Sequence, residues 1–361
     1  MEPIWTLGAL RVTPYSLLIF AGAVLGVLLA ARKKEARPAL PLMLLLSLLF
    51  GHWFWCLFNI NNTEEPVLQF VLFWQGGYTL YGAVFGGLLG AFIASRVLRR
   101  PMAEITDAAA PGAAAALLLG RLAEYFAGTG YGAIVEKESC CFFPLAFVTD
   151  RGEDYIEWSY AVWFWEAAAA LVILLLLLWI ARRARRGEVT VWFLALLGTT
   201  QIFFEQWRND DYVTTFNSFV RFSQVAALLT LAVLLVLLFR AHRPGGAAVC
   251  LSLTTFVLAS LTVVCAEFSF DKPWFDLWMR VGLVAAPLSA AVLLRLTRGG
   301  GGVLPGVSLV LCGALFSLLH FLADWSEDTV MLYTAIAFSV FLLGVTLREN
   351  MASGRPETPC L

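Results

Sequence analysis

The sequence predicts an all-α, polytopic integral membrane protein with about eleven transmembrane helices. The prediction rests on the composition, on the length of the apolar runs and on the distribution of charge between them. Of the 361 residues, 60% are hydrophobic and only 14% are charged, and the mean hydropathy is +0.78. Water-soluble domains carry about 45–50% apolar and roughly 25% charged residues. The composition therefore excludes an ordinary cytosolic protein.

The apolar runs have the length that a transmembrane helix needs, about 20 residues each. None of them alternates apolar and polar residues with a period of two, so a β-barrel is not expected. A basic cluster follows the first run instead of preceding it, which indicates a permanent helix and not a cleaved signal peptide. The predicted spans are residues 13–31, 40–58, 79–95, 107–128, 160–181, 189–207, 222–239, 247–266, 277–294, 303–323 and 330–347.

Charged residues are divided unequally between alternate loops. The loops on one side of the predicted membrane hold seventeen basic and six acidic residues, and those on the other side hold seven basic and seventeen acidic residues. Loops rich in Lys and Arg remain in the cytoplasm. This rule predicts an N-terminus outside and a cytoplasmic C-terminus, as an odd number of spans requires.

The character of the spans changes near Arg240. Before it, loops are long and the spans contain glycine, proline and charged residues; after it, four spans carry almost nothing titratable at mid-depth. We expect residues 1–240 to form a seven-helix core that holds any chemistry, residues 241–348 a four-helix extension, and residues 349–361 a cytoplasmic tail. The seven cysteines offer no disulfide framework and the three histidines no metal-ligand spacing, so neither metal nor cofactor is predicted.

Four charged residues are counted with the predicted spans and not with the loops, and a charge at the bilayer centre costs at least about 2.5–3.5 kcal/mol: Arg121, Glu124, Glu166 and Glu205. Arg121 and Glu124 are three residues apart on one helical face, and so are Glu205 and Arg208. The two pairs could close into one four-charge cluster. Such a cluster either locks helices together or binds a phosphate, for which the planar guanidinium fork is well suited.

A glycine-rich segment, residues 76–87, begins the third span. Its glycines continue to Gly90 and make a small-residue face that is typical of close helix packing. The pair Gly76 and Gly77 just before the span indicates bent backbone that lines a cavity. The phenol of Tyr81 could donate a hydrogen bond to a phosphate or ester oxygen there.

Taken together, these segments resemble the prolipoprotein diacylglyceryl transferase family over roughly residues 12–240. The family's glycine run is matched by residues 76–87, and its Tyr-Glu pair looks like Trp165-Glu166 here. Its Glu-x-x-Arg motif looks like Glu205 and Arg208, and Tyr15 stands where the family has a tyrosine. Its D-x-x-A-P…G-R motif is matched at unbroken spacing by Asp107, Ala110, Pro111, Gly120 and Arg121.

This chain departs from the family pattern at several places. Glu124 stands where the family has an asparagine, and Gln201 stands where it has an arginine. The family's G-A-R in the second span reads Gly51-His52-Trp53 here. Arg221, close to the retained Gln224, is a candidate replacement for one lost cation.

The resemblance implies an enzyme of the bacterial plasma (inner) membrane. Such an enzyme transfers a diacylglyceryl group from phosphatidylglycerol to the lipobox cysteine thiol of prelipoproteins, without a cofactor and without nucleic acid. The implied catalytic residues are Arg121, Glu124, Glu205, Arg208 and Tyr81, and the implied substrate-binding residues are Tyr15, Gly82, Glu166, Gln201 and Arg221.

The departures leave a second interpretation open. The chain could be a membrane paralogue that has lost the reaction or been repurposed, and that binds or moves phospholipid or transfers to another acceptor. A small-solute transporter is disfavoured, because the acidic residues lie on one side of the membrane and no inverted repeat is visible.

Overall fold

The computed structural model describes residues 5–7, 10–60, 66–71, 77–135, 138–151, 156–182, 184, 186–209, 215–217 and 220–223, with isolated positions up to residue 281. The chain divides into two compact units. The first contains Met1–Phe193 and Trp207–Ala226, and the second contains Leu194–Gln206 and Ala227–Cys360. Each unit is considered by itself below.

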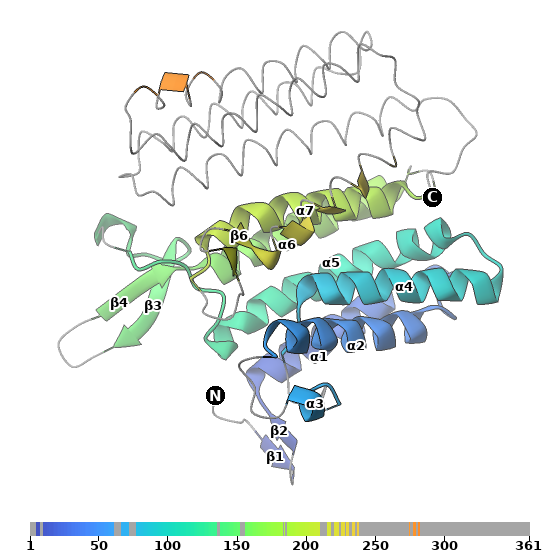
Figure 1. The fold of residues 1–361 in the computed structure, drawn as a ribbon, viewed down its shortest axis with the longest axis horizontal. Coiled ribbons are helices and arrows are strands. Elements are labelled where there is room, and N and C mark those ends of the chain that lie inside the picture. The colour runs from blue at the N-terminus through green and yellow to red at the C-terminus, as the bar shows by residue number, and fades with distance from the viewer. Residues whose placement is uncertain are drawn as a thin grey trace. The chain divides into compact units, whose positions relative to one another are not determined.

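Six long helices account for most of the described chain (Figure 1). Each coincides with one of the first six predicted spans, with ends that differ by at most five residues. The remaining predicted spans lie largely outside the described residues, and so do the predicted boundaries at 240 and 348. The long helices are α1 (Pro14–Ala30), α2 (Leu40–Phe58), α4 (Leu80–Leu98), α5 (Met102–Ala127), α6 (Val162–Ile180) and α7 (Glu188–Trp207); the short helices are α3 (Pro66–Gln69) and the 3₁₀ turn Glu138–Cys140.

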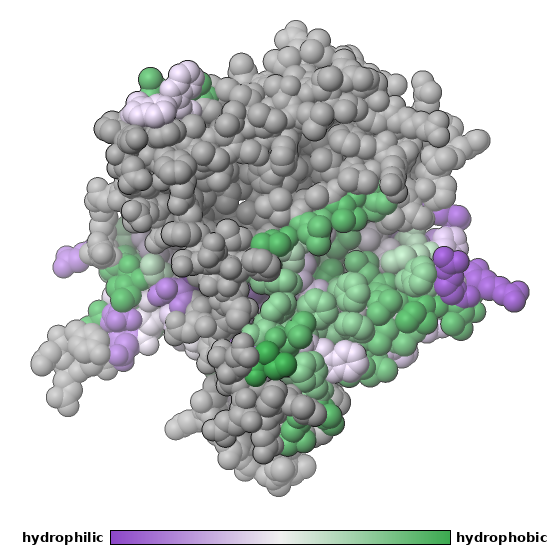
Figure 2. Space-filling model, viewed as in Figure 1, coloured by the Kyte–Doolittle hydropathy of each residue, from purple (hydrophilic) through white to green (hydrophobic). Residues whose placement is uncertain are grey.

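Four of these helices, α2, α4, α5 and α6, are long and apolar enough to cross a membrane, and α1 is a shorter apolar helix. Figure 2 shows mostly hydrophobic side chains along α2 and α4, with hydrophilic residues at the end where α4 meets α5. Arg96, Arg99 and Arg100 are exposed at that end. The chain is thus a mostly helical membrane protein, as predicted. The count of eleven helices and the orientation of the termini stay predictions.

Three two-stranded antiparallel hairpins accompany the helices, and the sequence did not predict them. They are β1–β2 (Trp5–Leu7 and Leu10–Val12), β3–β4 (Ala146–Arg151 and Ile156–Tyr160) and β5–β6 (Thr215–Asn217 and Val220–Arg221). The β3–β4 hairpin lies between α5 and α6 in the chain and extends beyond the ends of both helices (Figure 1).

Glycines bring α2 and α4 into backbone contact. Gly82, Gly86 and Gly90 follow one another at four-residue spacing, so they share one face of α4. A Cβ on Gly82 would lie 2.5 Å from the carbonyl oxygen of Phe50, and one on Gly90 would lie 2.7 Å from the Cα of Met43. This face is the helix-packing surface that the glycine pattern predicts. A role of Gly82 in substrate binding stays a prediction.

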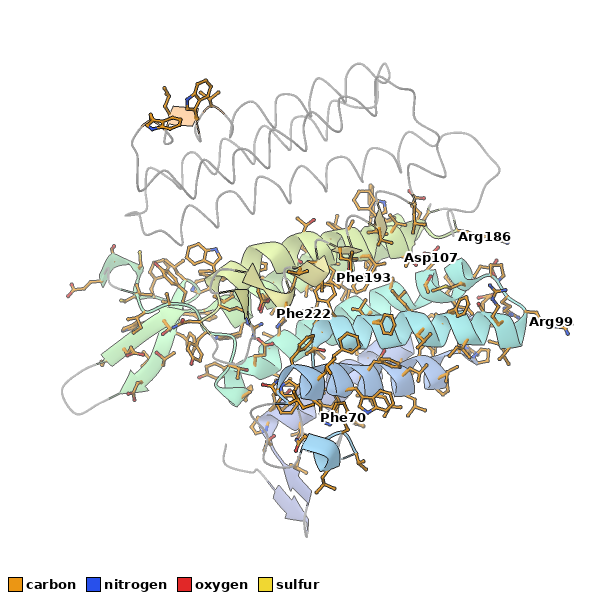
Figure 3. The ribbon with its side chains drawn as sticks, in the orientation of Figure 1. Phe70, Arg99, Asp107, Arg186, Phe193 and Phe222 are labelled. Atoms are coloured by element: carbon orange, nitrogen blue, oxygen red, sulfur yellow. The ribbon has the colours of Figure 1, made fainter. Side chains whose placement is uncertain are left out.

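Helix α7 receives its N-terminal cap from another helix. It begins after Gly187, and no side chain of its own first turn caps it. Instead, the carboxylate of Asp107 on α5 accepts hydrogen bonds from the backbone N–H of Gly187 (2.6 Å), the N–H of Thr190 (2.8 Å) and the Thr190 hydroxyl (2.7 Å). Figure 3 shows Asp107 at the same end as Arg99 and Arg186. The aspartate of the D-x-x-A-P motif therefore fastens the start of α7 to α5.

Replacing Asp107 with alanine is expected to lower the free energy of unfolding by roughly 2–4 kcal/mol, because three donors lose a charged acceptor. The thermal unfolding midpoint of the purified protein in detergent measures this loss. Glu104→Ala is the matched control, since it removes only an ion pair with Arg186 (2.9 Å) whose side chain is 66% exposed. Equal shifts in the two variants would contradict the capping role.

Candidate functional site: a buried ring of four charges

Two arginines and two glutamates alternate in a closed ring, which we call the charge ring: Arg121, Glu124, Glu166 and Arg208. Arg121 lies 2.5 Å from Glu124 (Nη1 to Oε1) and 3.2 Å from Glu166 (Nη2 to Oε1). Arg208 lies 3.1 Å from Glu124 (Nη2 to Oε2) and 3.0 Å from Glu166 (Nη1 to Oε2). Each guanidinium thus bridges both carboxylates.

Three parts of the first unit supply the ring. Arg121 and Glu124 lie in the last two turns of α5, Glu166 lies in the first turns of α6, and Arg208 follows the end of α7 with extended backbone. The segment after α5 holds Arg208 in place, because Gly132 forms a β-bridge with it and the N–H of Asn209 donates to the Tyr131 carbonyl (2.8 Å). Backbone hydrogen bonds between these two segments therefore bring Arg208 next to residues of α5 and α6 that are far from it in the sequence.

The ring is almost closed to water. The exposed fractions of the side chains are 4% for Glu166, 9% for Arg208, 10% for Arg121 and 17% for Glu124. Two positive and two negative charges leave no net charge. A buried ion pair repays its desolvation only when its geometry is good and its partners are complete. Because each charged group of the ring faces groups of opposite charge, the ring can be buried among apolar helices.

Gly130 lies against the side chain of Glu124. Gly128 and Gly130 both adopt positive φ angles, 67° and 75°, directly after α5. A Cβ on Gly130 would overlap Oε2 of Glu124 and would lie 3.0 Å from the Cβ of Trp163. Nη2 of Arg208 lies 3.1 Å from this Oε2, at ion-pair distance. Gly130 therefore leaves the room that the longer side chain at position 124 needs.

The structure places the other predicted site residues as follows. Tyr15 is the second residue of α1. Tyr81 is buried in the first turn of α4. Gln201 and Glu205 belong to the second unit and are buried there, with the Gln201 amide donating to Oε2 of Glu205 (2.5 Å). For Arg221 only the backbone is described, in β6.

His52, which stands where the family has the alanine of its G-A-R motif, fastens the segment before α4. Its buried ring has Nδ1 3.0 Å from the Gly77 carbonyl and Nε2 2.8 Å from the Gln69 carbonyl. Gly77 has a positive φ (76°), which fits the bent backbone that the glycine pair indicated, while Gly76 lies outside the described residues. The neighbouring Tyr78 side chain is 42% exposed, and burial of the rest of it raises the pKa of its phenol.

The spacing of residues in the sequence did not predict that Glu166 and its aromatic neighbours lie together at the site. Glu166 was singled out in the sequence as a charged residue inside an apolar run, but its spacing linked it to neither of the two charge pairs. Trp163, one turn earlier on α6, packs against Tyr125 and Phe147, with ring centroids 5.0 Å and 5.9 Å away. In the part of the chain that the structure describes, no group of three or more His, Cys, Asp or Glu side chains could hold a metal ion.

Apolar helices around a buried, arginine-containing polar centre define a helical membrane protein with a candidate phosphate-binding site. The chain belongs to the prolipoprotein diacylglyceryl transferase family, whose model matches residues 2–240. It is similar to the phosphatidylglycerol–prolipoprotein diacylglyceryl transferase of Streptococcus suis (27% identity over 225 residues, 58% of this chain and 82% of that protein). The Corynebacterium efficiens protein of the same name is 28% identical over 273 residues, 69% of this chain and 84% of its own length.

Proposed function

We propose that this protein transfers a diacylglyceryl group from phosphatidylglycerol to the thiol of the lipobox cysteine in prelipoproteins. Its acceptor cysteine arrives on the substrate, so no cysteine of the chain itself needs to be a nucleophile. We place the protein in the bacterial plasma membrane as a multi-pass protein. The names of the relatives support both substrates.

The charge ring is the observation that carries this proposal. It brings together Arg121 and Glu124 of the G-R segment, Glu166 and Arg208, which are separate motifs in the sequence. A guanidinium binds phosphate oxygens through two parallel hydrogen bonds and keeps its charge at any physiological pH. Two guanidiniums that share the same two carboxylates suit a phosphodiester and, still better, the phosphate monoester that leaves.

The reaction itself forms one bond and breaks one. The substrate thiol loses its proton and attacks the glyceryl carbon, a C–S bond forms, and the C–O bond to phosphate breaks with its electron pair on the phosphate oxygen. Arg121 and Arg208 would stabilise that developing negative charge in a site from which water is excluded. Because the thiolate is the nucleophile, a base is needed, and Glu124 and Tyr81 are the candidates in the first unit.

A second function is favoured by one specific observation. The ring is already neutral, and Gln201 donates to Glu205 where the family pattern has an arginine. A repurposed paralogue that binds or moves phospholipid without transferring its diacylglyceryl group would have this appearance. Binding of phospholipid without conversion of any lipobox peptide would support it.

Purified protein in micelles with phosphatidylglycerol and a tagged lipobox peptide tests the proposal. We expect the peptide to gain a diacylglyceryl group, and Arg121→Ala to lower the rate at least about a hundredfold through lost charge stabilisation. Arg186→Ala is the matched control, because Arg186 pairs with Glu104 and is 66% exposed. Full activity of Arg121→Ala would contradict the assignment. Complementation of a strain depleted of its own transferase is the cellular counterpart.

A further inference from the structure

We propose that the carboxylate of Glu124 occupies the position that the phosphate of the lipid donor takes, so that phosphatidylglycerol must displace it to bind. Glu124 then competes with the lipid and sets how tightly the charge ring holds it. The inference rests on the proposed function, because it concerns the donor's phosphate at the same site. It adds the residue that moves before the phosphate can enter.

The two glutamates contact different nitrogens of the two arginines. Glu124 lies 2.5 Å from Nη1 of Arg121 and 3.1 Å from Nη2 of Arg208. Glu166 lies 3.2 Å from Nη2 of Arg121 and 3.0 Å from Nη1 of Arg208. When Glu124 turns away, Glu166 therefore still bridges the two arginines. One nitrogen of each guanidinium is then released towards the place that the Glu124 carboxylate held.

A phosphodiester fits the contacts that the Glu124 carboxylate makes. Carboxylates and phosphodiesters each carry one negative charge and offer two oxygens to guanidinium groups. Glu124 uses both of its oxygens in this way, with Oε1 on Arg121 and Oε2 on Arg208. The two non-bridging oxygens of the phosphate would meet the same two nitrogens. The Glu124 carboxylate therefore marks the position of the phosphate.

The charge balance of the ring requires that one carboxylate leaves when a phosphate enters. With both glutamates in place the ring is neutral, and its side chains are at most 17% exposed. An added monoanion would leave a buried charge unmatched, which is costly. Without the Glu124 carboxylate, the two guanidiniums and Glu166 carry one positive charge, which one phosphodiester balances. Exchanging one anion for the other keeps the site neutral.

Glu124 is the glutamate that can leave at the lower cost. Its side chain is 17% exposed, against 4% for Glu166, so a smaller rearrangement exposes it to water. Glu124 also lies in the last turn of α5, where the helix dipole disfavours a negative charge, whereas Glu166 lies near the start of α6, where the dipole favours one. The arginines hold Glu124 in the ring, and the end of its own helix does not.

The sequence departure at position 124 fits this role. An asparagine there, as in the family pattern, would give the ring one net positive charge and leave no internal anion at the phosphate position. Glu124 supplies that anion in this chain. We therefore expect removal of its charge to strengthen the binding of the lipid, although the same change removes a partner of both arginines.

Equilibrium binding of phosphatidylglycerol to the purified protein in detergent, titrated by native mass spectrometry, tests the inference without turnover. Diacylglycerol, which has the same tails and no phosphate, is the matched ligand. We expect Glu124→Gln to bind phosphatidylglycerol at least about tenfold more tightly than the wild-type protein, since a neutral amide competes less for guanidiniums. Its affinity for diacylglycerol should stay unchanged. Glu104→Gln, which removes a carboxylate from the first turn of α5, should change neither affinity.

A second measurement uses the wild-type protein, so it does not depend on the folding of Glu124→Gln. A hydrophobic carbodiimide modifies carboxyl groups that ion pairs do not protect, and peptide mass spectrometry locates the modified residue. Because the bound lipid shifts Glu124 to its displaced position, we expect phosphatidylglycerol to raise the modification of Glu124 at least about threefold. Glu166 should stay protected, and diacylglycerol should change neither residue.

Three results would each overturn the inference: unchanged or weaker binding of phosphatidylglycerol by Glu124→Gln, an equal gain for diacylglycerol, or unchanged or lower modification of Glu124 when phosphatidylglycerol is present. A purely structural ring predicts the first and the third, together with a lower thermal unfolding midpoint for Glu124→Gln. The proposed function stands in all these cases as long as the wild-type protein converts the lipobox peptide. Absence of that conversion overturns the proposed function instead.

Discussion

Replacing Arg208 with methionine should lower the free energy of unfolding by about 3–5 kcal/mol, the cost of breaking a buried ion pair by removing one partner. The variant leaves Glu124 and Glu166 to share one guanidinium at 2.5 Å and 3.2 Å, with an uncompensated negative charge inside the bundle. If the proposed function holds, it should also lose diacylglyceryl transfer, since one of the two proposed phosphate-binding groups is gone. The thermal unfolding midpoint and the peptide assay measure the two effects separately.

A double variant separates charge balance from catalysis. Arg208→Met combined with Glu166→Gln restores a neutral site, so we expect it to regain at least half of the lost stability and none of the lost activity. Arg186→Met provides the baseline for losing an exposed arginine. Additive stability losses in the double variant would show that Arg208 and Glu166, 3.0 Å apart in the ring, do not act as a pair.

Replacing Gly86 with valine should separate α2 from α4. Even a Cβ at Gly86 would overlap the carbonyl oxygen of Leu46, which is backbone and cannot turn aside. We expect a loss of at least about 2 kcal/mol for Gly86→Ala and a larger one for valine, because overpacking here must move a helix. The thermal unfolding midpoint in detergent reports the change.

Gly120→Ala is the matched control for this prediction. Gly120 is also a helical glycine, but the atom nearest to an added methyl group would be Cδ1 of Ile19 at 3.9 Å, an ordinary contact distance. We expect Gly120→Ala to be neutral or to stabilise the protein by about 0.5–1 kcal/mol, because alanine restricts the unfolded chain. A destabilisation as large as that of Gly86→Ala would show that the effect comes from helix flexibility and not from the α2–α4 contact.

The apolar runs predicted the bounds of a helix well where nearly all of its residues are apolar. The run at 40–58 coincides with α2, whereas α5 begins at Met102, five residues before the predicted start. The missing turn contains Glu104 and ends at Asp107. Both are polar, and the contacts that accommodate them, with Arg186 and with the start of α7, are tertiary. Such contacts join residues far apart in the chain, so a short stretch of sequence does not predict them.

The candidate site was predictable only in part. Spacing placed Arg121 beside Glu124 and marked Arg208 as a member of the cluster. The fourth member in the described contacts is Glu166, which reaches the ring because α5 and α6 pack together. The β3–β4 hairpin was missed because its strands are short and charged, and they lie between two strongly apolar spans.

The order of the ring's members along the chain has a consequence for membrane insertion. Arg121 and Glu124 emerge together on α5, three residues apart, and form a self-neutralised pair within one helix. Glu166 follows with α6 and brings an unmatched negative charge, and Arg208 comes last. During synthesis the charges of the ring itself are therefore balanced after α5, negative after α6 and balanced again once Arg208 has arrived. A ribosome-bound intermediate that ends after α6 should remain associated with the insertion machinery, and one that ends beyond Arg208 should be released into the lipid.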